Sequence, residues 1–483
     1  MLRKCKIENH PAMAVPVLSV GQMREWEKAS WAAGRSETEV IHQVGRAIAG
    51  RLESLTRPGD RILFLAGKGH NGDDVRAAHK HLGSKREAVL MNVTDPEPAL
   101  RDFLGDLHFD WIVDGLFGIG LDRLLDAHWQ KFIAAVNDSR IPIVAVDVPS
   151  GLNAEIGAPE GAAIVADLTL TVGAPKAGML KAAQYVGRLE VLSDIGLIPC
   201  PIESDLNWTM DGDFARLPPR RPVESNKGTF GHVAIWAGSA GYHGAAVLAS
   251  QGALRARPGL VTVYPQEPVY VPVASQCRAA MVHAWRPGQT LPKSITAILI
   301  GPGLAAADVS DQMKNEARTL WHESPLAMVV DASALDWLQP GVVPSGAIRV
   351  ITPHPGEAGR ILDSSAASVQ EDRVKTLRRL SSRLGDCFVV LKGHQTLVGR
   401  STGQVFVNNS GNPGLAQGGS GDLLGGYIAG LLAQADWQKI AMTAIRFAVW
   451  EHGAAADRLA ARQANWTVED LIEELGRVAG SAQ

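Results

Sequence analysis

Short apolar runs rich in β-branched residues alternate with helix-length segments along most of the 483-residue chain, and this alternation restricts the fold more than any other feature. Continuous apolar strands separated by helices are typical of a parallel sheet with helices on both faces. The sequence therefore predicts an α/β fold with right-handed crossovers. The predicted strands are 61–67, 87–93, 111–118, 142–151 and 167–173 in the first half, and 231–238, 259–265, 296–303, 326–333, 347–357 and 387–393 in the second, with helices at 310–324 and 371–385.

The alternation is interrupted between residues 199 and 228, where prolines and charges follow no period. Such a stretch is typical of a linker, and a chain of this length forms two domains, or three. We assign residues 1–14 to a flexible N-terminal extension, 15–205 to a first domain, 206–225 to a linker and 226–483 to a second domain.

Charge and cysteine usage exclude several classes of protein. The net charge is −3 and the isoelectric point is near 6.5, which argues against binding nucleic acid through its phosphates. The four cysteines lie far apart without a CxxC pair, so neither a disulfide framework nor a zinc site is expected. The start lacks the apolar stretch of a signal peptide, and the apolar run 423–435 is too short to span a bilayer. We expect a soluble cytoplasmic protein with no membrane partner.

Three loops of the first half follow predicted strands and combine glycines with polar side chains: GKGHNGDD (67–74), DGLFGIGLDR (114–123) and DVPSG (147–151). Ligands of such sheets bind beyond the carboxyl ends of the strands. Turn glycines let backbone N–H groups approach a phosphate, and the side-chain oxygens of Asn71, Asp114 and Ser150 suit a hard cation. Asp147 is placed at a strand end facing the cleft. Turn chemistry alone explains any one of these loops, but explains all three together less well.

Four segments of the second half carry unusual residues: a glycine-rich stretch at 226–250, HPGE within 351–362, KGHQT within 389–398, and NPGLAQGGSGDLLGG starting at 412. A glycine-rich turn that opens a helix presents free N–H groups and the positive end of the helix dipole to phosphoryl oxygens. Asp422 at that helix start could accept a proton from a hydroxyl that attacks phosphorus, although an aspartate there could also be only a helix cap. The chain has no Walker A loop and no protein-kinase motif set.

The three loops of the first half, together with VLSVGQMREWEKAS (17–30), resemble the NAD(P)H-hydrate epimerase domain, the YjeF N-terminal family, over roughly residues 15–200. The resemblance implies a Rossmann-like, three-layer αβα domain that epimerises the hydroxyl-bearing C6 of hydrated NADH or NADPH. It further implies a potassium ion held by Asn71, Asp114 and Ser150, with Asp147 as the acid/base. The residues implied to contact the substrate are His70, Asn71, Gly72, Asp73, Asp74, Gly118, Ile119, Gly120, Leu121, Asp122, Arg123, Leu124 and Asp147.

The first glycine-rich loop departs from the pattern of that family. Lys68, His70, Asp73 and Val75 stand where Asn, Asn, Gly and Gly are usual. Asp73 adds a charge where bare backbone normally approaches a diphosphate. A degenerate first domain, fused to an active second one, therefore remains an alternative.

The GGSGD turn resembles the ribokinase-like superfamily, and HPGE, KGHQT and NPGLAQGGSGDLLGG narrow the resemblance to the ADP- or ATP-dependent NAD(P)H-hydrate dehydratase family over roughly residues 220–480. The resemblance implies that ADP (or ATP) with Mg²⁺ phosphorylates the hydroxyl of the hydrate, after which phosphate leaves, and that Asp422 is the base. Ser333 stands where that family often has Asp. The implied substrate contacts are Ala245, Gly303, His354, Pro355, Gly356, Glu357, Arg360 and Asp422, and the implied nucleotide contacts are Lys392, Gly393, His394, Gln395, Thr396, Gly418, Gly419, Ser420 and Gly421.

The order of the two regions resembles that of bifunctional NAD(P)H-hydrate repair enzymes. The resemblance implies an isomerase and a lyase in one chain, which act on both epimers of the NADH and NADPH hydrates. The lyase reaction would release AMP when ADP is the donor. We also expect a homo-oligomer. The choice between ADP and ATP stays open. A ribokinase-superfamily kinase of another small molecule is the alternative, which HPGE together with KGHQT disfavours.

Overall fold

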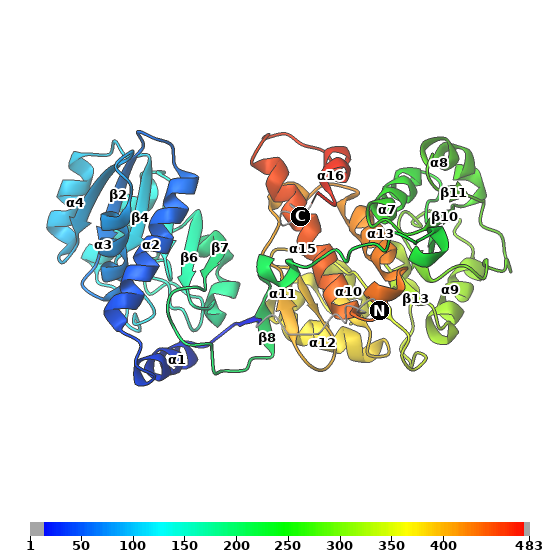
Figure 1. Ribbon diagram of the computed structural model, residues 1–483, viewed down its shortest axis with the longest axis horizontal. Helices are drawn as coiled ribbons and strands as arrows, with labels where there is room; N and C mark the ends of the chain where they lie inside the picture. The colour runs from blue at the N-terminus through cyan, green and yellow to red at the C-terminus, as the bar shows by residue number, and fades with distance from the viewer. Residues whose placement is uncertain (1–13, 478–483) are drawn as a thin grey trace. The chain divides into compact units, whose positions relative to one another are not determined.

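The structure, a computed structural model, describes residues 14–477. It divides between Trp208 and Thr209 into two compact units, which are described separately (Figure 1). The N-terminal extension predicted for residues 1–14 lies, except for Ala14, outside the described residues. The segment 206–225 begins with strand β8 (Leu206–Trp208) and contains the 3-10 helix η2 (Asp211–Phe214), so regular structure enters the expected linker. No helix between residues 14 and 477 has the length and apolarity needed to cross a membrane.

The first unit is built on a six-stranded, wholly parallel sheet in the order β3-β2-β4-β5-β6-β7. All five strands predicted for this half are present, although shorter than predicted, and β7 is an additional edge strand. A short antiparallel pair joins β1 (Val15–Pro16) to β8. The elements are α1 (Val20–Ala32), α2 (Glu37–Leu55), β2 (Arg61–Ala66), α3 (His70–His81), β3 (Glu87–Asn92), α4 (Pro96–Gly105), β4 (Trp111–Gly115), α5 (Ala127–Asp138), β5 (Ile143–Val146), β6 (Leu168–Val172), η1 (Ala177–Lys181), α6 (Ala183–Val186) and β7 (Arg188–Leu192).

Helices cover both faces of this sheet because neighbouring residues of a strand point to opposite sides. Phe64 of β2 packs in one core with α2 and α3, whereas Leu63 and Leu65 pack in another with α4 and α5. The predicted three-layer αβα arrangement is therefore confirmed.

The strand order places a topological switch point between β2 and β4. The chain leaves β2 toward β3 on one side and returns to β4, β5 and β6 on the other, so the loops after β2 and β4 diverge to opposite faces of the sheet. Such a point is where open α/β sheets leave a crevice for ligands. The segments that begin at Gly67 and Leu116 follow these two strands.

The second unit contains a larger mixed sheet in the order β17-β16-β15-β14-β13-β12-β9-β10-β11. The strands from β15 to β11 are parallel, and β16 and β17 form an antiparallel hairpin that the strand prediction does not include. The elements are η3 (Lys227–Phe230), β9 (His232–Trp236), α7 (His243–Arg255), β10 (Leu260–Tyr264), η4 (Glu267–Val269), α8 (Tyr270–Gln276), β11 (Met281–Val282), β12 (Ala297–Ile300), α9 (Asp311–Glu323), β13 (Ala327–Val330), η5 (Ala332–Trp337), β14 (Arg349–Ile351), α10 (Pro355–Ile361), α11 (Ala366–Glu371), α12 (Arg373–Arg383), β15 (Phe388–Leu391), β16 (Leu397–Gly399), β17 (Val405–Val407), η6 (Pro413–Leu415), α13 (Ser420–Leu432), α14 (Ala435–Gln438), α15 (Ala441–Ala460) and α16 (Val468–Glu474).

Helix α13 is the centre of one layer of this unit. It is buried along nearly its whole length and packs beside α7 (Figure 1). The two helices approach so closely that a Cβ on Gly426 would lie 2.0 Å from the carbonyl oxygen of Ala249. On the opposite face of the sheet, the buried Arg349 of β14 donates to the carbonyl of Trp321 near the end of α9. Packing on both sides fixes the start of α13 against the carboxyl ends of the strands.

Candidate functional site

The three predicted potassium ligands lie together at the switch point of the first unit. Asn71 and Ser150 both bond the backbone of Phe117: the Asn71 amide donates to its carbonyl at 2.7 Å, and the Ser150 hydroxyl accepts from its N–H at 2.8 Å. Asp114 accepts from the backbone N–H of Ser150 at 2.8 Å. Burial raises the pKa of Asp114 to about 6, against the effect of its hydrogen bonds. The Oδ1 atom of Asn71 is buried and has no hydrogen-bond partner.

Asp147 follows β5 and forms a buried ion pair with Lys176. Its backbone is left-handed, with φ of 62°, which is uncommon for a residue other than glycine. The Lys176 side chain is 1% exposed, and its ammonium donates to Asp147, to Thr171 Oγ1 at 3.0 Å and to the carbonyl of Val172 at 3.0 Å. The pair therefore holds one Asp147 oxygen in a fixed position at the end of the sheet.

Two further carboxyl groups lie in the electrostatic field of this pair. Burial raises the pKa of Glu27, on α1, and the charge of Asp147 raises it further, while Lys176 opposes both. Burial likewise raises the pKa of Asp74 well above its usual value, with Asp147 and Asp73 adding to the effect. This end of the sheet thus carries both an ion-paired carboxylate and two carboxyl groups whose pKa values are raised.

The segment from His70 to Asp74, expected to be a loop, is the first turn of helix α3. The close packing of that turn needs Gly72, because a Cβ there would lie 2.1 Å from the carbonyl oxygen of Gly67. Asp73, one of the unusual residues, pairs with Arg76 at 2.8 Å. His70 is exposed and faces Glu37 at 3.3 Å.

The unusual Val75 lies inside the core of the first unit. It is fully buried, and its Cγ2 atom would lie 2.2 Å from a Cβ on Gly115. The predicted substrate loop 118–124 is irregular, and Leu124 at its end is 68% exposed. The two predicted substrate segments therefore differ: 70–74 is helical, and 118–124 is an open loop.

Asp422 lies in the first turn of α13, directly after the turn formed by Gly418 and Gly419. Gly419 has φ of 94°, a left-handed conformation that glycine adopts without strain. Burial raises the pKa of Asp422 to about 7, with the charges of Asp331 and Glu357 adding to the shift and Lys392 opposing it.

Lys392, at the end of β15, pairs with Asp331 at the end of β13. Its ammonium lies 3.0 Å from Asp331 Oδ1 and 4.0 Å from Glu357 Oε2, and 3.4 Å from where a Cβ on Gly421 would be. Burial alone would lower the pKa of Lys392, but Asp331 and Glu357 overcome this and raise it. Lys392 and Gly421, which the sequence places in two separate motifs, therefore meet at one point.

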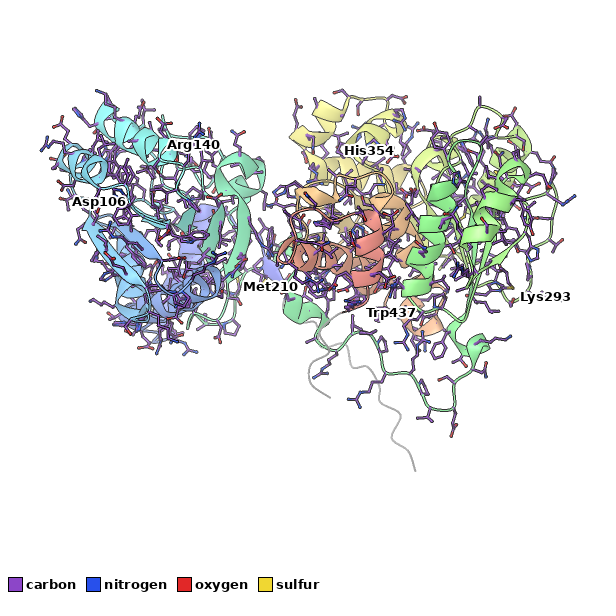
Figure 2. The ribbon with its side chains drawn as sticks, turned by 90° about the horizontal axis from the view of Figure 1, so that it is seen from above. Asp106, Arg140, Met210, Lys293, His354 and Trp437 are labelled. Carbon is purple, nitrogen blue, oxygen red and sulfur yellow. The ribbon has the colours of Figure 1, made fainter. Side chains whose placement is uncertain are left out.

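The HPGE segment opens helix α10 at the end of β14, where Figure 2 labels His354. Glu357 accepts from the backbone N–H of His354 at 2.8 Å, and the His354 ring accepts from the N–H groups of Gly356 and Glu357. Arg360 is directed to Asp336, at 3.1 Å. At the neighbouring switch point, between β9 and β12, a Cβ on Gly303 would lie 2.8 Å from that of Ala245, so these two residues are adjacent as well.

Three side chains that interact with the candidate residues are not selected by the sequence analysis: Asp331, Lys176 and Glu27. Asp331 is 2% exposed and accepts from Thr352 Oγ1 at 2.6 Å in addition to Lys392. A signal for it exists, since Asp331 directly follows the apolar strand AMVV, as Asp147 follows IVAV. Lys176 also lies shortly after a strand, since the tripeptide GAP separates it from β6.

No group of three or more His, Cys, Asp or Glu residues within 14–477 is arranged to hold a metal ion. The donor set expected for potassium is of another type, since it combines an amide, a carboxylate and a hydroxyl. The orphaned Asn71 Oδ1 atom and the buried Asp114 carboxylate are oxygen donors of the kind that hard cations take.

The comparisons with known proteins agree with the two-unit architecture. The sequence model of the NAD(P)H-hydrate dehydratase family matches residues 233–477, and that of the YjeF-related protein N-terminus matches residues 85–178. A ribokinase-like superfamily protein from Enterococcus faecalis is 25% identical, with a TM-score of 0.50, over 58% of this chain and 97% of its own. An ADP/ATP-dependent NAD(P)H-hydrate dehydratase from Bacillus subtilis, co-crystallised with ATP and Mg²⁺, is 30% identical, with a TM-score of 0.49, over 56% of this chain and 95% of its own. The likeness to the Enterococcus faecalis protein shows that the second unit is a ribokinase-like α/β domain, as predicted.

Relatives match over both units. The bifunctional NAD(P)H-hydrate repair enzyme Nnr of Coxiella burnetii is 34% identical over 91% of this chain and 94% of its own length. The enzyme of the same name from Escherichia coli K12 is 34% identical over 86% of this chain and 84% of its own. The chain belongs to the family of bifunctional NAD(P)H-hydrate repair enzymes.

Proposed function

We propose that the second unit dehydrates the S-hydrate of NADH or NADPH at the expense of a nucleoside di- or triphosphate, and that the first unit interconverts the R- and S-hydrates. The observation that carries the first part is Asp422 itself. It is a carboxyl group with a pKa of about 7, positioned at the N-terminus of α13 and beside the Lys392–Asp331 pair. A group with such a pKa can take up a proton at neutral pH.

In the proposed dehydration, Asp422 accepts the proton of the C6 hydroxyl while that oxygen attacks the terminal phosphorus of the nucleotide. The leaving group is AMP when ADP is the donor. The C6–O bond of the phosphoester then breaks, phosphate departs, and loss of a proton from C5 restores the ring double bond. Phosphate leaves far more readily than hydroxide, which explains the need for a nucleotide.

The other residues of this site would bind and orient the two substrates. The N–H groups at Gly418, Gly419, Ser420 and Gly421 would stabilise the transferring phosphoryl group. Lys392 would bind phosphate oxygens, since its Asp331 partner keeps it charged. We place the hydrate against Ala245 and Gly303 at the switch point and against the HPGE segment, and the nucleotide against the loop 392–396. Mg²⁺ would arrive on the phosphates of the nucleotide, where it neutralises charge.

In the proposed epimerisation, Asp147 is the acid/base. The C6 hydroxyl lies on a carbon bonded to the ring nitrogen, so removal of its proton lets a carbonyl form as the C–N bond opens. Closure on the other face, with return of the proton, gives the epimer. Lys176 keeps one oxygen of Asp147 in place, and Glu27 and Asp74 are the neighbouring groups able to hold a proton.

A potassium ion held by Asn71, Asp114 and Ser150 would supply a fixed positive charge near the first turn of α3. The orphaned Asn71 oxygen supports this assignment. The segments 70–74 and 118–124 would contact the hydrated dinucleotide. Because Asp73 is paired with Arg76, its extra charge is partly neutralised, which favours an active first unit over a degenerate one.

The test follows the absorbance of reduced nicotinamide when purified chain receives S-hydrate with ADP, with ATP or with neither. R-hydrate is then supplied in place of S-hydrate. We expect nucleotide-dependent recovery of NAD(P)H from S-hydrate, and a slower recovery from R-hydrate that requires the first unit. A stable phosphorylated product would instead favour a ribokinase-type kinase. Recovery of NAD(P)H from S-hydrate but not from R-hydrate would show that the first unit is inactive.

A further inference from the structure

Arg373, the first residue of α12, is bonded almost entirely to the predicted nucleotide loop. Its Nη1 atom donates to the carbonyls of His394 and Gln395, the second at 3.3 Å. Its Nη2 atom donates to the carbonyls of Leu391 at 3.0 Å and Lys392 at 3.3 Å. One guanidinium thus binds four carbonyls within residues 391–395, which run from the last residue of β15 into the connection to β16.

The loop needs such support because its backbone is unfavourable. Gly393 has φ of 127° and Gln395 has φ of 52°, so a residue with a side chain adopts the left-handed region within a short connection. The guanidinium lies against this turn, since a Cβ on Gly393 would be in van der Waals contact with Nη2 of Arg373, at 3.5 Å. Without the guanidinium, four carbonyls would lose their donors and the loop would relax toward other conformations.

The charge of Arg373 has no acidic partner among residues 14–477. The ion pairs described there do not include it, and its Nε atom is buried without a hydrogen-bond partner. Burial lowers its pKa to about 10, so it remains a cation at neutral pH. Its charge, together with burial, lowers the pKa of His394. A buried cation without a counter-ion favours the binding of an anion nearby.

We propose that Arg373 is a positioning residue for the nucleotide: it holds residues 391–395 in the conformation that receives a nucleoside di- or triphosphate and adds an uncompensated positive charge beneath that loop. It does not contact the hydrate and takes no part in proton transfer. This inference rests on the nucleotide site proposed above.

The test compares Arg373→Gln and Arg373→Lys with wild type, varying the nucleotide at saturating hydrate and then the hydrate at saturating nucleotide. Loss of charged hydrogen bonds of this kind weakens binding by about 10- to 100-fold, and we expect that increase in the nucleotide KM of Arg373→Gln. The hydrate KM and the kcat at saturating nucleotide should stay within about three-fold. Arg373→Lys should be intermediate, because an ammonium keeps the charge but cannot span the four carbonyls.

Arg378 offers a matched control on the same helix. Its guanidinium donates to the carbonyls of Ser401 at 3.1 Å and Gly403 at 3.0 Å, in the connection between β16 and β17. Arg378→Lys should leave both KM values unchanged. A purely structural role for Arg373 would lower kcat and the melting temperature while leaving the nucleotide KM as in wild type, and that result would overturn the proposal.

The two proposals fail in distinguishable ways. If wild-type chain binds ADP or ATP with Mg²⁺ by calorimetry but does not dehydrate the hydrate, the proposed reaction is wrong, and the calorimetric Kd of Arg373→Gln still tests the role of Arg373. If wild type dehydrates the hydrate and Arg373→Gln binds nucleotide as tightly as Arg378→Lys, only the inference about Arg373 is wrong.

Discussion

Replacing Asp422 by Asn should abolish dehydration while making the second unit more stable. The amide keeps the size of the carboxyl group but cannot accept a proton. General bases contribute about 10²- to 10⁴-fold to rate, so we expect a loss of at least about 100-fold in kcat. The wild-type rate should also rise with pH as Asp422 ionises around its pKa of about 7. About a tenth of the enzyme would be active one pH unit below that value.

The stabilisation follows from the same pKa. Asp422 has an ordinary value of 3.8 when unfolded and about 7 when folded. The folded state therefore binds the proton more tightly than the unfolded state. The contribution of this proton to the free energy of unfolding is complete below about pH 4 and is lost as pH rises toward 7. Each pKa unit corresponds to about 1.36 kcal/mol, so the ionised carboxylate costs up to about 4 kcal/mol at pH 8. Asp422→Asn should recover part of that free energy of unfolding at pH 8 and little at pH 4.

The assays are steady-state dehydration of S-hydrate between pH 5.5 and 8.5, within the range where proteins are generally most stable, and thermal unfolding of both proteins at high and low pH. Asp311→Asn is a matched control. Asp311 also lies in the first turn of a helix of this unit, but it is 91% exposed and pairs with Lys314. The control should keep wild-type activity and gain no stability at pH 8. An Asp422→Asn protein that retains more than about a tenth of wild-type kcat would contradict the assignment of the base.

The remaining predictions concern the first unit. Lys176→Met removes the partner of Asp147 and should lower epimerisation by at least about 100-fold with dehydration of S-hydrate unchanged, as measured by chromatography of the two hydrates. Replacing potassium by tetramethylammonium should slow epimerisation in the same assay, and Ser150→Ala should weaken the dependence on potassium. Asp73→Gly should change epimerisation by less than about two-fold, since Asp73 is partly exposed; a large gain would instead support a degenerate domain. Val75→Gly should lower the free energy of unfolding by about 2–3 kcal/mol through a core cavity and a helical glycine, as measured by denaturant titration.

The strands of the parallel sheets could be predicted because burial on both faces demands continuous apolar runs, as in ILFL of β2 and AILI of β12. Strand β7 was not predicted, because it lies at the sheet edge and alternates charged with apolar residues in RLEVL. Strands β16 and β17 were not predicted, because an apolar run of only three residues is too short to indicate a strand. Strand β16 pairs with β15 and β17 pairs with β16, and local sequence does not encode such pairing.

The positions of the candidate residues could be predicted, but their partners could not. Parallel strands bring their carboxyl ends to one edge, which placed Asp147 and Lys392 correctly at strand ends. The Asp147–Lys176 pair joins residues 29 apart in sequence, and the Lys392–Asp331 pair joins residues 61 apart. Such pairs depend on which strands become neighbours and in what register, so the chain order alone does not reveal them. The helical first turn at 70–74 is a similar case, because its single glycine and its polar residues resemble those of a loop.

Both units contain a buried lysine beside a strand-end carboxylate, but only in the first unit is that carboxylate the proposed base. In the first unit the ammonium of Lys176 bonds Asp147 directly, so the proposed base is itself the ion-paired group. In the second unit the ammonium of Lys392 bonds Asp331, and that pair leaves Asp422 without a direct cation, with its pKa raised by burial and by the charge of Asp331. A base of this second kind is half protonated near neutral pH, and after each turnover it readily releases the proton that it accepted. The rise of rate with pH near 7 that comes from Asp422 should therefore be seen in dehydration.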